Sequence, residues 1–166
     1  MRTITVALGE KTYNIEIAAG LLDQIGAKAR VLSQAVKAAI ISDSNVDPLY
    51  GERLERSLAA SGFEVTRIVF AAGEQSKNLT VLGQVYDELA RAGLTRSDLI
   101  LTLGGGVPGD LGGFAAATFL RGIDFIQVPT SLLAQIDSSV GGKVAIDLPS
   151  GKNLAGSFYQ PKAVFI

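Results

Sequence analysis

An apolar run at residues 99–103 leads directly into a glycine-rich segment, residues 104–110, and then into small residues that continue to Phe119. A strand that ends in glycines and precedes a helix is the arrangement of an anion site. Glycine lets backbone amides approach the ligand, and a helix start presents unpaired N–H groups at the positive end of its dipole. The segment therefore predicts a phosphate or pyrophosphate site; the alternative is a tight turn that packs the helix closely on the sheet.

Gly104, Gly106 and Gly109 match the G-x-G-x-x-G spacing of dinucleotide-binding proteins, a pattern that is weak on its own. That pattern also expects an acidic residue about 20 residues later. Asp124 has this spacing, but it stands at the entry to an expected strand, and Asp110 is nearer to the anion site. Nucleoside-triphosphate loops are excluded, because no lysine in the chain has both their upstream glycine and their following Ser or Thr.

Short apolar runs alternate with helical patterns along the chain. Strands are expected at residues 38–42, 65–70, 99–103 and 125–128, and helices at residues 21–32, 46–58, 79–92 and 108–119. This alternation implies right-handed crossovers and a mostly parallel sheet with helices on both faces. Residues 4–8 and 13–17 alternate between apolar and polar and predict an N-terminal β-hairpin at a sheet edge. We therefore expect a Rossmann-like α/β fold.

The end of the chain differs in character. Residues 138–143 and 149–153 are rich in glycine and polar side chains and predict loops. Residues 163–166 look like the opening of another buried strand, whereas domain boundaries usually lie in exposed polar linkers. We therefore expect one domain that is part of a longer protein.

Composition excludes several classes of function. Fifteen Lys and Arg against 16 Asp and Glu give a formal charge of -1, so no overall field attracts nucleic acid. The chain has no Cys and no His, which removes thiolate sites, the commonest metal ligand and the usual proton-transfer group. No apolar run approaches the roughly 18 residues of a membrane span, and the N-terminus lacks a signal-peptide core. We expect a cytoplasmic protein with no metal ligands in this chain.

Polar and charged residues follow the expected strands at the edge where open α/β sheets bind ligands. Asp43 ends one strand and could serve a ligand or cap the next helix. Residues 73–77 follow another strand and could equally be simple turn chemistry. Later loops carry a set that favours an anionic substrate or cofactor over isolated surface charges: Arg121, Lys143, Lys152 and Asn153, with Asp137 as counter-charge.

From Asp43 to Phe165 the chain resembles the 3-dehydroquinate synthases, which belong to the sugar-phosphate cyclases. The resemblance rests on several ordered segments, namely residues 73–77 (GEQSK), 104–110, 121–123, 125–143, 151–153 and 158–162. Such a set is far more specific than one glycine pattern. The departures from the usual residues are Pro108 for an aliphatic residue, Ser131 for a second threonine, Val144 for threonine and Asp147 for asparagine.

The resemblance implies an NAD- and metal-dependent lyase of the shikimate pathway. Its substrate would be a phosphorylated sugar acid, 3-deoxy-D-arabino-heptulosonate 7-phosphate, and its products 3-dehydroquinate and phosphate. A glutamate and two histidines of a helical C-terminal domain would hold zinc or cobalt, and the whole enzyme would be a homodimer. Because that domain is absent here, we expect this chain to bind NAD weakly and to be inactive alone.

The resemblance also assigns residues. Those implied to contact NAD are Asp43, Glu74, Gln75, Lys77, Gly105, Gly106, Val107, Pro108, Gly109, Asp110, Thr130, Ser131, Lys143 and Lys152. Those implied to face the substrate and the nicotinamide are Asp137, Lys143, Lys152, Asn153 and Arg121. The alternatives are another cyclase, such as 2-deoxy-scyllo-inosose synthase or an epi-valiolone synthase, and a non-catalytic NAD-binding module. Alcohol dehydrogenases of the superfamily lack the Arg121 and paired-lysine set.

Overall fold

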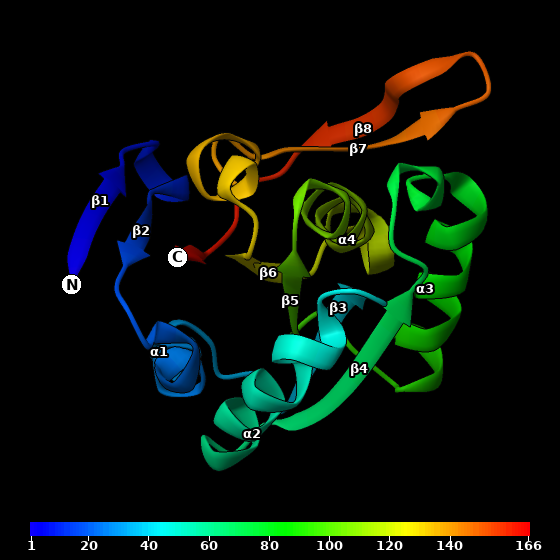
Figure 1. Cartoon of the computed structure of the whole chain (residues 1–166). Helices are drawn as coiled ribbons and strands as arrows, with labels where there is room; N and C mark the ends of the chain where they lie inside the picture. Colours follow the sequence, from blue (N-terminus) through cyan, green and yellow to red (C-terminus); the bar gives the residue numbers. More distant parts are fainter.

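The computed structural model describes residues 1–166 and contains a seven-stranded sheet in the order β1-β2-β9-β6-β5-β3-β4 (Figure 1). The strands of this sheet are β1 (Arg2–Val6), β2 (Tyr13–Ile17), β3 (Lys37–Asp43), β4 (Glu64–Phe70), β5 (Leu99–Gly104), β6 (Asp124–Pro129) and β9 (Ala163–Phe165). Only β1 and β2 pair antiparallel, and every other pair is parallel. The expected mostly parallel sheet and its N-terminal hairpin are confirmed.

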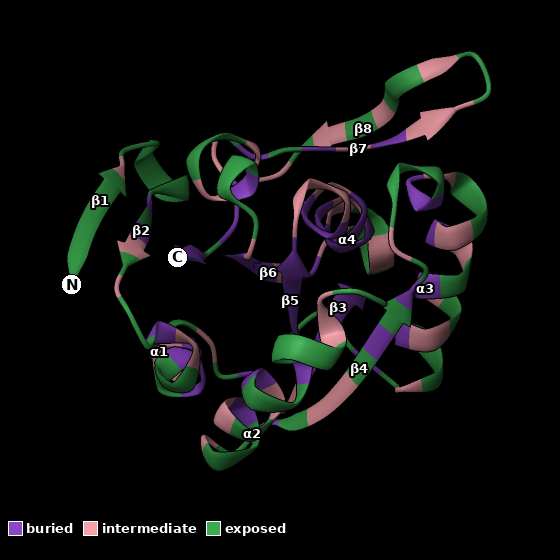
Figure 2. Ribbon diagram, viewed as in Figure 1, coloured by how far each residue is buried: buried purple, intermediate pink, exposed green.

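Helices cover both faces of the sheet, as the alternation of strands and helices predicts. They are α1 (Ile25–Leu32), α2 (Glu52–Ala60), α3 (Leu79–Arg91) and α4 (Gly106–Thr118). Along β3, Ile40 packs in the core beneath α1 and α2, and its neighbour Ile41 packs on the opposite face with α3 and α4. Because both faces are covered, β5, which lies between β6 and β3, is buried along its whole length (Figure 2).

Short helical turns introduce several of these helices. They are η2 (Leu21–Gln24), η3 (Asp47–Gly51) and η4 (Glu74–Ser76), with η1 (Gly9–Lys11) in the first hairpin and η5 (Phe119–Arg121) after α4. Asn78 caps α3, since its side-chain oxygen accepts the N–H of Val81 at 3.0 Å. No helix combines the length and the apolar character needed to cross a bilayer.

The loops predicted at residues 138–143 and 149–153 are confirmed only in part: residues 139–142 and 149–150 lie outside regular elements, whereas Lys143 and residues 151–153 belong to strands. Strands β7 (Lys143–Leu148) and β8 (Gly151–Phe158) form an antiparallel hairpin that lies over α4 (Figure 1). The glycines are packing residues: a Cβ at Gly113 of α4 would lie 2.4 Å from a methyl of Val144, and one at Gly156 would lie 2.4 Å from the Val144 carbonyl oxygen. Close approach of the hairpin to α4 requires glycine at Gly113, and close approach of the two strands requires it at Gly156.

The final strand is buried, as expected. Residues of β9 pair with β2 on one side and with β6 on the other. The direction of the connections reverses between β3 and β5, since β3 is followed by β4 on one side and β5 by β6 on the other. Ligands of open α/β sheets bind at the carboxyl ends of strands at such a reversal. Asp43, Gly104 and Pro129, the last residues of β3, β5 and β6, mark this edge.

Candidate functional site

The start of α4 is the centre of the candidate site. Gly105 is its N-cap residue, and the helix begins at Gly106, two residues before the expected start. No side chain caps this end. The first N–H groups of a helix have no partner within it, so the amides at the start of α4 can serve an anion at the positive end of the helix dipole.

The glycines of this turn divide into two groups. Gly104 has φ +154°, and a Cβ there would lie 2.5 Å from Pro108, while a Cβ at Gly109 would lie 2.9 Å from Gln127 Oε1. The fold therefore requires glycine at Gly104, and it admits a Cβ at Gly109 only if the Gln127 side chain shifts. At Gly105 and Gly106 the nearest atoms to an added Cβ are hydroxyl oxygens at 3.4 and 3.5 Å, and φ is not positive. The protein's own packing does not require glycine at these two positions, whereas close approach of a ligand to the backbone does.

A helical segment after β6 lies beside this turn. The hydroxyl oxygens nearest to Gly105 and Gly106 belong to Ser131 and Ser138, respectively, and η6 (Ala134–Ser138) carries the second. Thr130 is held at the edge of the sheet because its N–H donates to the Gly104 carbonyl at 2.9 Å. Hydroxyl donors therefore flank the turn on one side.

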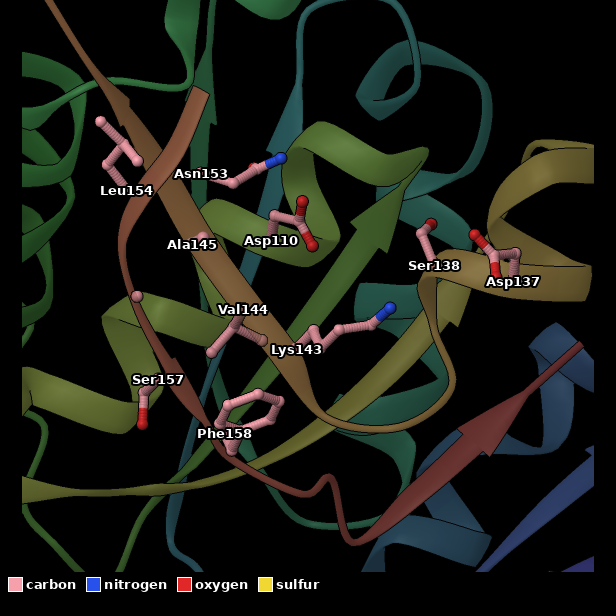
Figure 3. Close-up of a pocket in the computed structure, with 11 residues that line it drawn as sticks. Asp110, Asp137, Ser138, Lys143, Val144, Ala145, Asn153, Leu154, Ser157 and Phe158 are labelled. Atoms are coloured by element: carbon pink, nitrogen blue, oxygen red, sulfur yellow. The ribbon is translucent and has the colours of Figure 1, made fainter. Parts of the chain in front are cut away.

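A cavity of about 510 Å³ opens between α4, η6 and the β7–β8 hairpin. Its polar lining includes Asp110, Asp137, Ser138, Lys143 and Asn153 (Figure 3). Apolar side chains of the hairpin, among them Val144 and Phe158, form the remaining wall. A volume of this size suits a small metabolite. The lysine can bind one acidic group of a ligand, and the carboxylates and neutral polar groups can bind its hydroxyl groups.

A buried lysine joins three elements at the edge of this cavity. Lys77, whose side chain is 5% exposed, donates to Asp110 Oδ2 at 2.5 Å and to Asn153 Oδ1 at 2.6 Å. Burial raises the pKa of the Asp110 carboxyl, although the bond from Lys77 opposes the change. An ammonium group has three donors, so these two bonds leave Lys77 one N–H for a ligand.

Asp43 and Gln75, which the resemblance assigns to NAD, have structural hydrogen bonds of their own. Asp43 Oδ1 accepts the N–H groups of Asn45 and Val46 at 2.9 and 3.0 Å, so Asp43 caps the turn before η3. Gln75 Nε2 donates to the Ala72 carbonyl at 2.9 Å. Both residues lie at the carboxyl edge of the sheet, as expected.

Two of the expected substrate residues lie outside the cavity. Lys152 is 71% exposed and forms an ion pair with Glu74, with Nζ 3.1 Å from Oε1. Arg121 follows the far end of α4, whose 13 residues span about 20 Å. In this chain the structure brings together Asp137, Lys143 and Asn153, and it does not bring Arg121 to them.

Sequence reasoning missed Ser138 as a cavity residue and treated Asp147 only as a departure from the usual asparagine. The structure shows that Asp147 Oδ1 accepts the N–H of Asn153 at 2.7 Å. The signal that was available is the alternation of Val144 and Ile146 with Ala145 and Asp147, which is typical of a half-buried strand.

Comparison with known proteins agrees with this description. The sequence profile of the family "3-dehydroquinate synthase N-terminal" matches residues 67–166. The 3-dehydroquinate synthase of Clostridium acetobutylicum is 57% identical over 166 residues, which is all of this chain and 47% of that protein. That of Caulobacter vibrioides is 52% identical over 165 residues, or 45% of its length. The chain thus spans about half the length of the curated relatives it matches.

Solved cyclase structures share the fold over nearly the whole chain. A 2-deoxy-scyllo-inosose synthase complexed with carbaglucose-6-phosphate, NAD+ and Co2+ is 30% identical with a TM-score of 0.91, covering 99% of this chain and 45% of that one. A 2-epi-5-epi-valiolone synthase from Streptomyces hygroscopicus subsp. jinggangensis, with NAD+ and Zn2+ bound, is 29% identical with a TM-score of 0.82, covering 97% and 44%.

Fold and site together define a Rossmann-like α/β domain with a glycine-lined helix start at the reversal point of its sheet. The profile match covers more than half of the residues, and the curated relatives match along the whole chain. The chain belongs to the 3-dehydroquinate synthase N-terminal family.

Proposed function

We propose that this chain is the NAD-binding N-terminal domain of a 3-dehydroquinate synthase. The relatives named 3-dehydroquinate synthase support this assignment at 52–57% identity. In that role the chain contributes to converting 3-deoxy-D-arabino-heptulosonate 7-phosphate to 3-dehydroquinate and phosphate. The whole enzyme would work in the cytoplasm as a homodimer.

The observation that carries the proposal is the open backbone at Gly105 and Gly106. Their N–H groups, together with the dipole of α4, would hold the pyrophosphate, with the hydroxyls of Ser131 and Ser138 beside it. Asp43 and residues 74–77 would hold the adenosine side, since they follow the neighbouring strands at the same edge. NAD bound there supplies the transient oxidation of one substrate alcohol and its later restoration.

The cavity beside α4 would receive the substrate. Lys143 offers a cation for an acidic group, and Asp137 and Asn153 offer partners for hydroxyl groups. Figure 3 shows the Lys143 side chain extending toward the Ser138 and Asp137 side of the cavity. Lys152 and Arg121, both exposed, would take up phosphate contacts from the rim or from another chain.

The residues of this chain do not fit the zinc or cobalt site of the whole enzyme. The chain contains no His, and no group of three or more Asp or Glu side chains is arranged to hold a metal ion. No catalytic step is therefore assigned to a metal through these residues. The Co2+ and Zn2+ reported for the related cyclases belong to those proteins.

A chimera tests the substrate. This chain replaces the matching 47% of the Clostridium acetobutylicum relative, and phosphate release is measured with the heptulosonate phosphate and with a hexose 6-phosphate. The expected result is release from the heptulosonate phosphate alone, and its loss in a Lys143→Ala chimera. A folded chimera that acts only on the hexose phosphate would establish the alternative cyclase, and one that binds NAD but releases no phosphate would favour a non-catalytic module.

A further inference from the structure

A closed ring of hydrogen bonds links the β7–β8 hairpin to Lys77, the residue that follows η4. The Asp147 N–H donates to the Lys77 carbonyl at 2.8 Å, and Asp147 Oδ1 accepts the Asn153 N–H at 2.7 Å. Asn153 Oδ1 in turn accepts from Lys77 Nζ at 2.6 Å. Each of the three residues therefore contributes both backbone and side chain, so that moving one displaces the other two.

The backbone at Asn153 explains why such a ring is needed. Asn153 has φ +56°, in the left-handed region that residues other than glycine seldom adopt, although asparagine does so more readily than most. It lies in a bulge, because residues 152–154 face Asp147 alone between the pairs Leu148–Gly151 and Ile146–Ala155. Bulges re-aim side chains near functional sites, and this one directs the Asn153 amide toward Lys77 and the cavity.

We propose that Asp147 is a positioning residue that holds Asn153 in its left-handed conformation and thereby fixes Lys77 and the cavity wall. Asp147 does not line the cavity, and it acts through Asn153. The importance of the ring for cofactor and substrate rests on the proposed function, whereas the ring itself is a property of this chain alone.

The atom of Asp147 that matters is its acceptor oxygen. The negative charge of Asp147 is a separate influence. Burial is the main cause that raises the pKa of Asp110, and the charges of Glu74 and Asp147 raise it further. Asparagine keeps an acceptor oxygen and removes the charge, while alanine removes both. Comparing Asp147→Asn with Asp147→Ala therefore separates positioning from charge.

Hydrogen exchange tests the ring directly. In the 166-residue chain, exchange of the Asn153 amide is measured by NMR in the parent, Asp147→Asn, Asp147→Ala and the control Asp124→Ala, which removes an exposed ion pair with Lys162. We expect Asp147→Ala to accelerate exchange at Asn153 at least tenfold, and Asp147→Asn and Asp124→Ala to change it less than threefold. Equal exchange in the parent and Asp147→Ala would overturn the proposal.

NAD+ titration of the same variants tests the consequence. Asp147→Ala is expected to weaken binding about fivefold, and Asp147→Asn is expected to restore it, which mere loss of stability would not produce. If the parent does not bind NAD+, the proposed function fails while the exchange result still decides the ring. Loss of the Asn153 bond with unchanged NAD+ affinity would overturn the positioning role.

Discussion

Gly106→Ala should separate the stability of the chain from its ligand binding. A Cβ at Gly106 would lie 3.5 Å from Ser138 Oγ, which is ordinary contact, and φ is not positive there. Alanine also restricts the unfolded chain and suits a helix better, so the free energy of unfolding should stay equal or rise by about 0.5–1 kcal/mol.

Binding should change in the opposite direction. The added methyl occupies the space through which an anion reaches the first amides of α4, and losing one hydrogen bond to a charged group costs about 1.5–3 kcal/mol. NADH affinity should therefore fall roughly tenfold to hundredfold. Urea unfolding followed by circular dichroism measures stability, and NADH fluorescence titration measures affinity.

The matched control is Gly83→Ala in α3, where nothing lies within 4 Å of an added Cβ. This variant should be stabilised by about 1 kcal/mol, as expected for a helix interior, and should bind NADH like the parent. The reasoning is refuted if Gly106→Ala binds NADH as tightly as Gly83→Ala does.

Three further substitutions test packing and electrostatics. Gly113→Ala should destabilise the chain by about 1–3 kcal/mol, because its Cβ would lie 2.4 Å from Val144, and adding Val144→Ala should recover part of the loss in urea unfolding. Asp98→Asn should reduce the loss of stability at acid pH. Burial raises the pKa of Asp98, but hydrogen bonds from the Lys37 N–H and from the N–H and hydroxyl of Thr95 help to hold it below its usual value. The stabilisation from Asp98 is therefore present above about pH 4 and is lost as the pH falls further. Unfolding curves from pH 2 to 6 that match the parent would contradict this. Lys77→Met should lower the free energy of unfolding by about 3 kcal/mol, because it leaves the Asp110 carboxylate partly buried without its cation. For the same reason it should raise the pKa of Asp110 further, as measured by carboxyl NMR titration. An unchanged titration would disprove the pairing.

Much of the fold is predictable because its signals are local. Apolar runs such as residues 99–103 define strands, and Asn78 defines a helix start through one hydrogen bond with a neighbour in sequence. The hairpin of β7 and β8 was missed because its glycines, such as Gly156, are required by close packing against the facing strand, at Val144 and Ala145, and not by a turn. Judged by propensity alone, such glycines indicate turns or loops that interrupt a strand.

The candidate site is likewise predictable from local sequence only in part. Residues 104–110 identify the anion turn, yet the sequence does not say which glycines serve the fold and which leave room for a ligand. That distinction depends on the conformation of the turn, which sets Pro108 against Gly104, and on β6, which brings Gln127 against Gly109. The burial of Lys77 between Asp110 and Asn153 is likewise invisible in sequence, because the partners lie 33 and 76 residues away.

NMR titration of the ¹⁵N-labelled chain with NAD+ tests the central claim most directly. The claim is that the pyrophosphate binds the backbone at the start of α4. The largest saturable shifts are expected at the amides of Gly105, Gly106 and Val107, with smaller ones at Thr130 and Ser131. Saturable binding that leaves the amides of residues 105–107 unmoved, or no binding at millimolar NAD+, would contradict it.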